Sequence, residues 1–242
     1  MKLKTLTIAL VAILFTGLTS YGQTVNEVVD NYFKAIGGRD KVKSIKTMKI
    51  TGKFFMGPME IPVESSVKKP NKVYSTATAQ GMTQRMGFDG KDAWQFSPFM
   101  GDTVPHKMPE ENSRDMKDQA DIEGPLMDYK EKGSTVELIG KEDIEGTPAY
   151  KIKILKKSGD LEYYFIDAES FLLVKSVSKK SFQGKEVESE TVYSDYRDVD
   201  GMKMAFSNES RQVGEEAGQK FIIDKVEVNV DMNDEMFLLP TK

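Results

Sequence analysis

The 242-residue sequence contains no cysteine, one histidine and one tryptophan. Without cysteine the chain forms no disulfide and has neither a thiolate metal ligand nor a cysteine nucleophile. A zinc site needs several His or Cys ligands and a Ser-His-Asp triad needs a histidine, so His106 is the only residue that could serve either. It follows Pro105 in a polar stretch, and no G-x-S-x-G motif occurs. We therefore expect His106 to be an ordinary surface residue.

Motifs that hold nucleotides or calcium are missing as well. Neither G-x-x-x-x-G-K-[ST] nor G-x-G-x-x-G occurs. The stretch Asp198-Val199-Asp200-Gly201 resembles part of a calcium loop, but Tyr196 and Ser207 stand where the full motif requires Asp and Glu. We expect a hairpin turn there, no metal and no cofactor, and a protein that is not an enzyme. Asn208-Glu209-Ser210 matches an N-glycosylation acceptor, which is a weak three-residue signal.

The sequence also lacks an apolar run of the roughly 20 residues that a membrane-spanning helix needs. The apolar stretch Leu6–Phe15 follows Lys2 and Lys4 and precedes Ser20-Tyr21-Gly22, as in a secretory signal peptide. We expect residues 1–22 to be removed, leaving residues 23–242 as one soluble, unanchored domain. The formal net charge is −4, and losing two lysines makes the mature chain more acidic. This argues against nucleic acid or an anionic membrane surface as a partner.

Hydrophobic periodicity predicts one helix followed by many strands. Between Val25 and Ile36 the apolar residues recur three and four apart and stop at Gly37-Gly38, which predicts an amphipathic helix. From Ile45 the period is two, and the pattern on either side of Gly57-Pro58 predicts a hairpin. Similar short strands fill the second half: Tyr150–Ile154, Leu161–Ile166, Phe171–Val177, Val187–Tyr193, Met202–Phe206 and Val226–Val230.

These strands, joined by hairpin-length turns, predict a mainly β fold with one antiparallel sheet of about ten or eleven strands. A sheet of that size has to curl strongly. A polar stretch at residues 105–129, broken by Gly124-Pro125, interrupts the strands. We expect it to be a functional loop that carries a short helix and folds over the curled sheet.

Methionine is concentrated in the first half of the chain, where nine of the 14 methionines fall between residues 48 and 127. Met side chains are flexible and suit surfaces that adapt to variable apolar partners. Two interpretations remain open: the methionines fill gaps in the core of a curved sheet, or they line an adaptable apolar cavity on its concave side.

The only tryptophan, Trp94, follows the turn signal Asp89-Gly90-Lys91. A three-residue loop there would pair Met86 with Trp94, whereas a two-residue turn would place them on opposite faces. We predict the three-residue loop and a Trp94 that points into the concavity. Plain core packing of Trp94 is the alternative.

The chain resembles the LolA-like family of periplasmic lipoprotein-sorting proteins, in the longer form familiar from Bacteroidota. The stretches that carry the resemblance are Tyr32–Gly38, Ile45–Gly52, Gly87–Trp94, Gly124-Pro125-Leu126 and Asp195–Met202. The resemblance implies a half-open antiparallel β-barrel around an apolar cavity, closed by helices or loops that act as a lid. It also implies a carrier that holds acyl chains in transit across the periplasm. Arg85 is the candidate for the arginine with which this family contacts its lid.

The expected ligands are lipids or the acyl chains of lipoproteins, with envelope proteins as further partners. The candidate ligand-binding residues are Met48, Ile50, Phe54, Met56, Met59, Ile61, Val63, Met86, Phe88, Trp94, Phe96, Leu126 and Met127. The alternative is a structural or interaction module of the envelope whose barrel is packed solid and binds no ligand.

Overall fold

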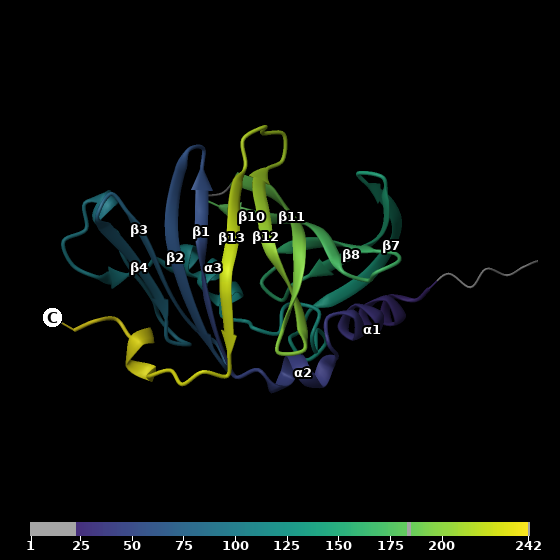
Figure 1. Ribbon diagram of the computed structural model, residues 1–242, viewed down its shortest axis with the longest axis horizontal. Helices are drawn as coiled ribbons and strands as arrows, with labels where there is room; N and C mark the ends of the chain where they lie inside the picture. The colour runs from purple at the N-terminus through teal and green to yellow at the C-terminus, as the bar shows by residue number, and fades with distance from the viewer. Residues whose placement is uncertain (1–22, 183–184, 242) are drawn as a thin grey trace, which may run out of the picture.

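The computed structural model describes residues 23–182 and 185–241, and the expected signal peptide lies outside them. The described residues form one antiparallel sheet in the order β6-β5-β4-β3-β2-β1-β13-β12-β11-β10-β9-β8-β7 (Figure 1). The sheet is strongly curled but not closed, since β6 and β7 remain as its two edges. The mainly β, half-open architecture that the sequence predicts is therefore confirmed.

The strands are β1 Thr47–Met56, β2 Met59–Lys68, β3 Lys72–Ala79, β4 Met82–Phe88, β5 Ala93–Phe96, β6 His106–Lys107, β7 Thr135–Ile144, β8 Thr147–Leu155, β9 Leu161–Asp167, β10 Leu173–Phe182, β11 Lys185–Val199, β12 Met202–Gln212 and β13 Gln219–Val228. The helices are α1 Val25–Ala35, α2 Arg39–Ser44 and α3 Glu110–Gln119, with 3₁₀ turns η1 Pro98–Met100 and η2 Asp234–Phe237. The sequence predicted ten or eleven strands, fewer than the 13 observed. Short or charged strands such as β6 and β7 have no hydrophobic run that reveals them.

The predicted N-terminal helix is confirmed as α1. It begins with a capping box, in which Thr24 and Glu27 bond each other's backbone N–H groups, and it buries Val28 and Phe33. The chain then turns sharply, because Gly37 has φ +115° and a Cβ there would lie 2.3 Å from the carbonyl oxygen of Gly201. Only glycine fits this close approach, so Gly37 ties the end of α1 to the β11–β12 turn.

The predicted hairpin of β1 and β2 is confirmed, with Met48 opposite Val67 and Met56 opposite Met59. On its other edge β1 pairs with β13, where Met48 lies opposite Val228. Alternate residues of these strands share one face. This pairing joins the N-terminal and C-terminal parts of the sheet into one continuous concave surface.

Two apolar clusters fill the concave side of the sheet. The larger packs α1 and α2 against the sheet and includes Leu126 and Met127. The smaller packs Met116 and Ala120, at the end of the insertion helix, against β2, β3, β4 and β5. The insertion thus carries the predicted short helix, α3, and this helix lies on the concave side of the sheet.

The predicted hairpin loop before Trp94 is wrong. Phe88 pairs with Ala93 and Gly87 with Trp94, so the loop has four residues, Asp89–Asp92. The Asp89 carboxylate accepts hydrogen bonds at 2.8 Å from the backbone N–H groups of residues 91 and 92. This side-chain cap stabilises the longer loop and moves Trp94 to the face opposite Phe88.

Trp94 therefore points away from the concavity and lies under the C-terminal segment. Its Nε1–H donates a 2.8 Å hydrogen bond to the carbonyl oxygen of Phe237, and its side chain is fully buried. Tyr74 packs beside it with ring centroids 6.0 Å apart. The indole lies flat against Gly87, because a Cβ at that position would be 2.4 Å from Nε1. Trp94 is therefore a core-packing residue, which was the alternative interpretation of its role.

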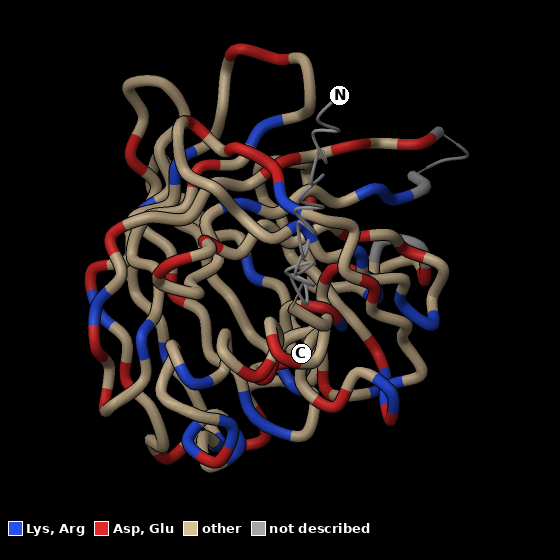
Figure 2. Tube along the Cα trace, turned by 90° about the vertical axis from the view of Figure 1, so that its right-hand side faces the viewer, with Lys and Arg blue, Asp and Glu red and all other residues tan. Residues whose placement is uncertain are grey.

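The outer surface carries charges of both signs. Lysine, arginine, aspartate and glutamate are distributed over the strands and loops (Figure 2). Many are paired across strands, as in Lys53–Glu60 at 3.0 Å and Lys151–Glu142 at 2.7 Å. Exposed pairs of this kind contribute about 0–1 kcal/mol each, so they favour solubility more than stability.

Candidate ligand cavity

A cavity of about 370 Å³ lies on the concave side of the sheet. Residues of α1, α2, β1, β2, β10, β11, β12 and β13 line it, together with residue 119 at the end of α3 and residues 121–124 after it. Segments far apart in sequence meet here because β1 pairs with β13.

The floor of the cavity is apolar. Ile36 and Val42 contribute from the helical end, Met48 and Ile50 from β1, and Leu173 from β10. All except Ile50 are buried. A floor of this composition offers van der Waals contacts but no hydrogen bonds, which suits a hydrocarbon chain.

Tyrosines form the middle of the wall. Burial raises the pKa of Tyr32 to about 12, and burial likewise raises the pKa of Tyr193 and Tyr196. Tyr196 donates a 2.5 Å hydrogen bond to the carbonyl oxygen of Leu173, and the Tyr193 hydroxyl is 3.0 Å from the Ser176 hydroxyl. These phenols stay neutral at any physiological pH, so they add polarity to the wall without charge.

Asn208 on β12 also lines the cavity. Its Oδ1 atom is buried and has no hydrogen-bond partner among the described residues. The glycosylation motif at Asn208 therefore starts on an inward-facing strand residue, where a glycan would not fit.

Ion pairs hold the insertion over the concave side. Glu123 lies 2.6 Å from Lys69, and Lys180 of β10 bridges Asp115 and Asp118 of α3 at 2.6 and 3.0 Å. These contacts connect α3 to the C-terminal half of the sheet, while its apolar side packs on the N-terminal half. The insertion thus spans the two halves.

The structure distributes the predicted ligand-binding residues over several places. Met48 and Ile50 line the cavity. Phe54, farther along β1, packs on Phe221 with ring centroids 5.3 Å apart, and Phe221 lines the cavity. Ile61 lies opposite Phe54 on β2 and is half-buried. These residues form a continuous apolar surface that leads from the cavity toward the tip of the β1–β2 hairpin.

Other predicted residues lie around this surface. Val63 continues the same face of β2, whereas Met56 and Met59, at the hairpin tip, are 50% and 43% exposed. Met86 and Phe88 pack against α3 in the smaller apolar cluster.

The remaining predicted residues are structural or face outward. Leu126 and Met127 are fully buried in the larger cluster beneath α1. Trp94 and Phe96 lie on the opposite face of the sheet, together with Arg85, which pairs with Phe96. Arg85 is exposed there and is not placed to contact α3.

Sequence reasoning missed much of the cavity wall. Tyr32, Tyr193, Met204, Asn208 and Phe221 all line the cavity and were not predicted as ligand-binding. Tyr193 and Met204 lie in predicted strands, whereas Asn208 and Phe221 lie in parts of β12 and β13 that were not predicted. Alternation along β12 places Met204 and Asn208 on one face. The pattern could not tell which face is concave, because both faces of these strands mix polar and apolar residues.

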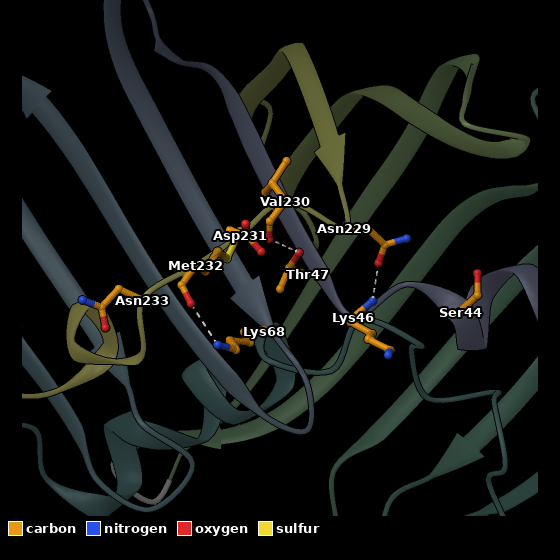
Figure 3. Close-up of a pocket in the computed structure, with 9 residues that line it drawn as sticks. All are labelled: Ser44, Lys46, Thr47, Lys68, Asn229, Val230, Asp231, Met232 and Asn233. Carbon is orange, nitrogen blue, oxygen red and sulfur yellow. Dashed lines mark hydrogen bonds between the residues drawn. The ribbon is translucent and has the colours of Figure 1, made fainter.

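A larger crevice of about 810 Å³ lies outside the concavity, at the base of β1 (Figure 3). Its polar groups are engaged in attaching the C-terminal segment. Thr47 donates a 2.6 Å hydrogen bond to the carbonyl oxygen of Val230, and Lys68 donates one of 2.9 Å to that of Met232 (Figure 3). Lys68 also pairs with Asp234 at 2.8 Å. Since these contacts are structural, we take the smaller concave cavity as the candidate site.

Two sequence expectations outside the cavity are confirmed. His106 is a surface residue, 44% exposed, with its Nδ1 3.7 Å from Asp102. Residues 198–201 form the hairpin turn between β11 and β12, in which the Asp198 carboxylate accepts a 3.0 Å hydrogen bond from the Gly201 N–H. Over the part of the chain that is described, no group of three or more His, Asp or Glu could hold a metal ion. Nor does any described helix have the length and apolar character to cross a membrane.

Comparison of the sequence with protein-family models and with curated proteins finds no match. Solved structures do match. A LolA superfamily protein from Nitrosomonas europaea superposes with a TM-score of 0.60 at 11% identity, covering 90% of this chain and 98% of that one. The chain has a LolA-like fold. A DUF1329 family protein from Desulfovibrio piger gives a TM-score of 0.61 at 12% identity, with the same coverage.

A third structure, described as an outer membrane lipoprotein-sorting protein domain from Vibrio parahaemolyticus, gives a TM-score of 0.57 at 8% identity. It covers 87% of this chain and 94% of the other. Identities this low establish the LolA-like fold alone. The activity has to be argued from the cavity of this chain.

Proposed function

We propose that this LolA-like protein binds an acyl chain or a similar hydrophobic ligand in the concave cavity and carries or senses it in the periplasm. The observation that supports the proposal is the concave cavity, whose lining includes the apolar residues Met48 and Ile50 and residues 121–124 of the insertion. The expected signal peptide would export the chain to that compartment. The proposed activity is binding, with no chemical step.

The physical basis is burial of hydrocarbon. Each methylene moved from water to an apolar site contributes about 0.8 kcal/mol, so a lined cavity binds lipid without any charged group. A volume of about 370 Å³ is near the lower end of ligand pockets, which favours a single chain. Release would require residues 119–124 to move, because affinity of this kind otherwise dissociates slowly.

The first test is lipid analysis. Protein purified from the periplasm of its native cells should carry an extractable lipid in a fixed ratio, identified by mass spectrometry. Trp94 emission should not change when a ligand binds, since the indole lies on the other face of the sheet. A shift would show that ligand reaches the outer face and would contradict the assignment of the site.

The second test fills the cavity. Ile50→Trp should lower affinity for a fluorescent fatty-acyl probe by tenfold or more, because the indole occupies the floor. Lys49→Trp is the matched control, since Lys49 is the neighbouring residue on the outer face, where it pairs with Glu64 at 3.3 Å. Equal probe affinity in both variants would refute the site. Absence of both co-purified lipid and probe binding in the parent protein would favour the packed envelope module instead.

A further inference from the structure

Asn208 contributes a buried, unsatisfied acceptor to the polar wall of the cavity. Asn208 lies opposite Tyr193 on β11 and Phe221 on β13. The Tyr193 hydroxyl is already bonded to the hydroxyl of Ser176 at 3.0 Å. The Asn208 Oδ1 atom is buried and has no partner among the described residues. Such an acceptor lowers stability unless a donor reaches it.

Asn208 marks a boundary on the concave face. On the side of Asn208 toward Met204 and Met202 lies the apolar floor of the cavity. Beyond it, two residues farther along β12, Ser210 bonds Thr191 at 2.8 Å, and the next row contains the Ser178–Ser189 pair at 2.9 Å. Residues two apart share a face of a strand, so these hydroxyls continue the Asn208 side of the sheet. These hydroxyls bond one another, whereas Asn208 Oδ1 has no partner among the described residues.

Among the described residues, Lys203 is the only cationic residue that lines the cavity, and it is exposed. The acids beside the cavity are paired, Glu123 with Lys69 at 2.6 Å and Asp121 with Lys132 at 2.5 Å. Lys203 lies in register with Asp198, five residues along β12 from Asn208. A ligand carboxylate at Asn208 would meet another oxygen acceptor and would lose its hydration.

Building on the proposed function, we propose that the cavity selects acyl ligands with an uncharged head group that donates a hydrogen bond, a hydroxyl or an amide. The head group donates to Asn208 Oδ1, and the chain lies on the floor formed by Met48 and Ile50. A methyl ester, which has no donor, leaves the acceptor unsatisfied. A carboxylate has no donor at neutral pH and also incurs the cost of desolvation.

The test compares ligands of one chain length that differ only in the head group: a primary alcohol, a primary amide, a methyl ester and a carboxylate. Each is measured by displacement of the fluorescent fatty-acyl probe from the mature protein. The parent protein should bind the alcohol and the amide about tenfold more tightly than the ester, since an unsatisfied buried acceptor costs about that much. Asn208→Leu should abolish this preference.

Ser75→Ala is the matched control. Ser75 Oγ is likewise buried without a partner and lies on the concave face, but it does not line the cavity. This variant should keep the tenfold preference. If Asn208→Leu does not fold, the ligand series on the parent protein decides alone. Equal or tighter binding of the ester or the carboxylate overturns this inference and leaves the proposed function intact. Failure of all four ligands to bind overturns both.

Discussion

Replacing Gly87 with alanine should displace Trp94 and loosen the C-terminal segment. A Cβ at Gly87 would lie 2.4 Å from Trp94 Nε1 and 2.5 Å from Cε2, distances that side-chain carbons do not adopt. The indole cannot retreat, because its Nε1–H is bonded at 2.8 Å to the Phe237 carbonyl and its side chain is fully buried. The ring must move, and the hydrogen bond breaks when it does.

The expected cost combines two effects. Overpacking of a buried site costs about 1–3 kcal/mol, and a buried carbonyl that loses its donor adds about 1–3 kcal/mol. We expect a loss of about 2–6 kcal/mol in the free energy of unfolding, which lowers Tm by about 4–24 °C for a chain of this size. Thermal unfolding followed by circular dichroism measures the loss. Tryptophan emission of the folded variant should shift to the red as the indole meets water.

Arg85→Ala is the control, because Arg85 is exposed on the same face of the same strand. It should change stability by less than about 0.5 kcal/mol. Binding of the acyl probe should be unchanged in both variants, since the cavity lies on the other face. A Gly87→Ala protein with unchanged Tm and emission would refute the observed hairpin register and restore the prediction that Trp94 points inward.

Two further predictions concern the insertion and the outer face. Met116→Ala should lower the free energy of unfolding by about 2–4 kcal/mol, since Met116 is 2% exposed in the cluster beneath α3. Urea unfolding measures this loss, and Met100→Ala, at an 82% exposed site, is the control. A loss below about 1 kcal/mol would contradict the packing of α3. The hydrogen bond from Lys175 is the main cause that lowers the pKa of Glu190 from its usual 4.5. The stability it contributes is therefore present above pH 4.5 and lost as the pH falls through the lower folded value. The Tm difference between the parent and Glu190→Gln should shrink from pH 6 to pH 3, and a constant difference would contradict this coupling.

Local patterns predicted most of the fold. The helix before Gly37-Gly38, the β1–β2 hairpin and the strands of the second half all follow from periodicity and turn residues, which act between neighbours in sequence. Among the strands that were not predicted, β7 is charged along much of its length and β6 has only two residues. Backbone pairing with a neighbouring strand holds them in the sheet: β6 pairs with β5, and β7 pairs with β8.

The candidate site was predictable only in part. Met48 and Ile50 were found because β1 alternates cleanly and its apolar face is unambiguous. Asn208 and Tyr193 were missed because polar residues on a half-buried strand are ordinarily assigned to solvent. They face the cavity because β12 and β11 curl toward β1, and strand alternation does not encode that curvature.

The sequence by itself determined that the chain is an antiparallel β protein with a leading helix and a helical insertion, because periodicity and turn chemistry are local properties. Tertiary structure alone decided which face each strand turns inward. At the hairpin before Trp94, the Asp89 carboxylate caps two N–H groups and lengthens the loop. The indole packs against Gly87, and its Nε1–H donates a hydrogen bond to the carbonyl oxygen of Phe237, 143 residues away. A one-residue change of register reverses every side chain, and contacts distant in sequence select between the two outcomes.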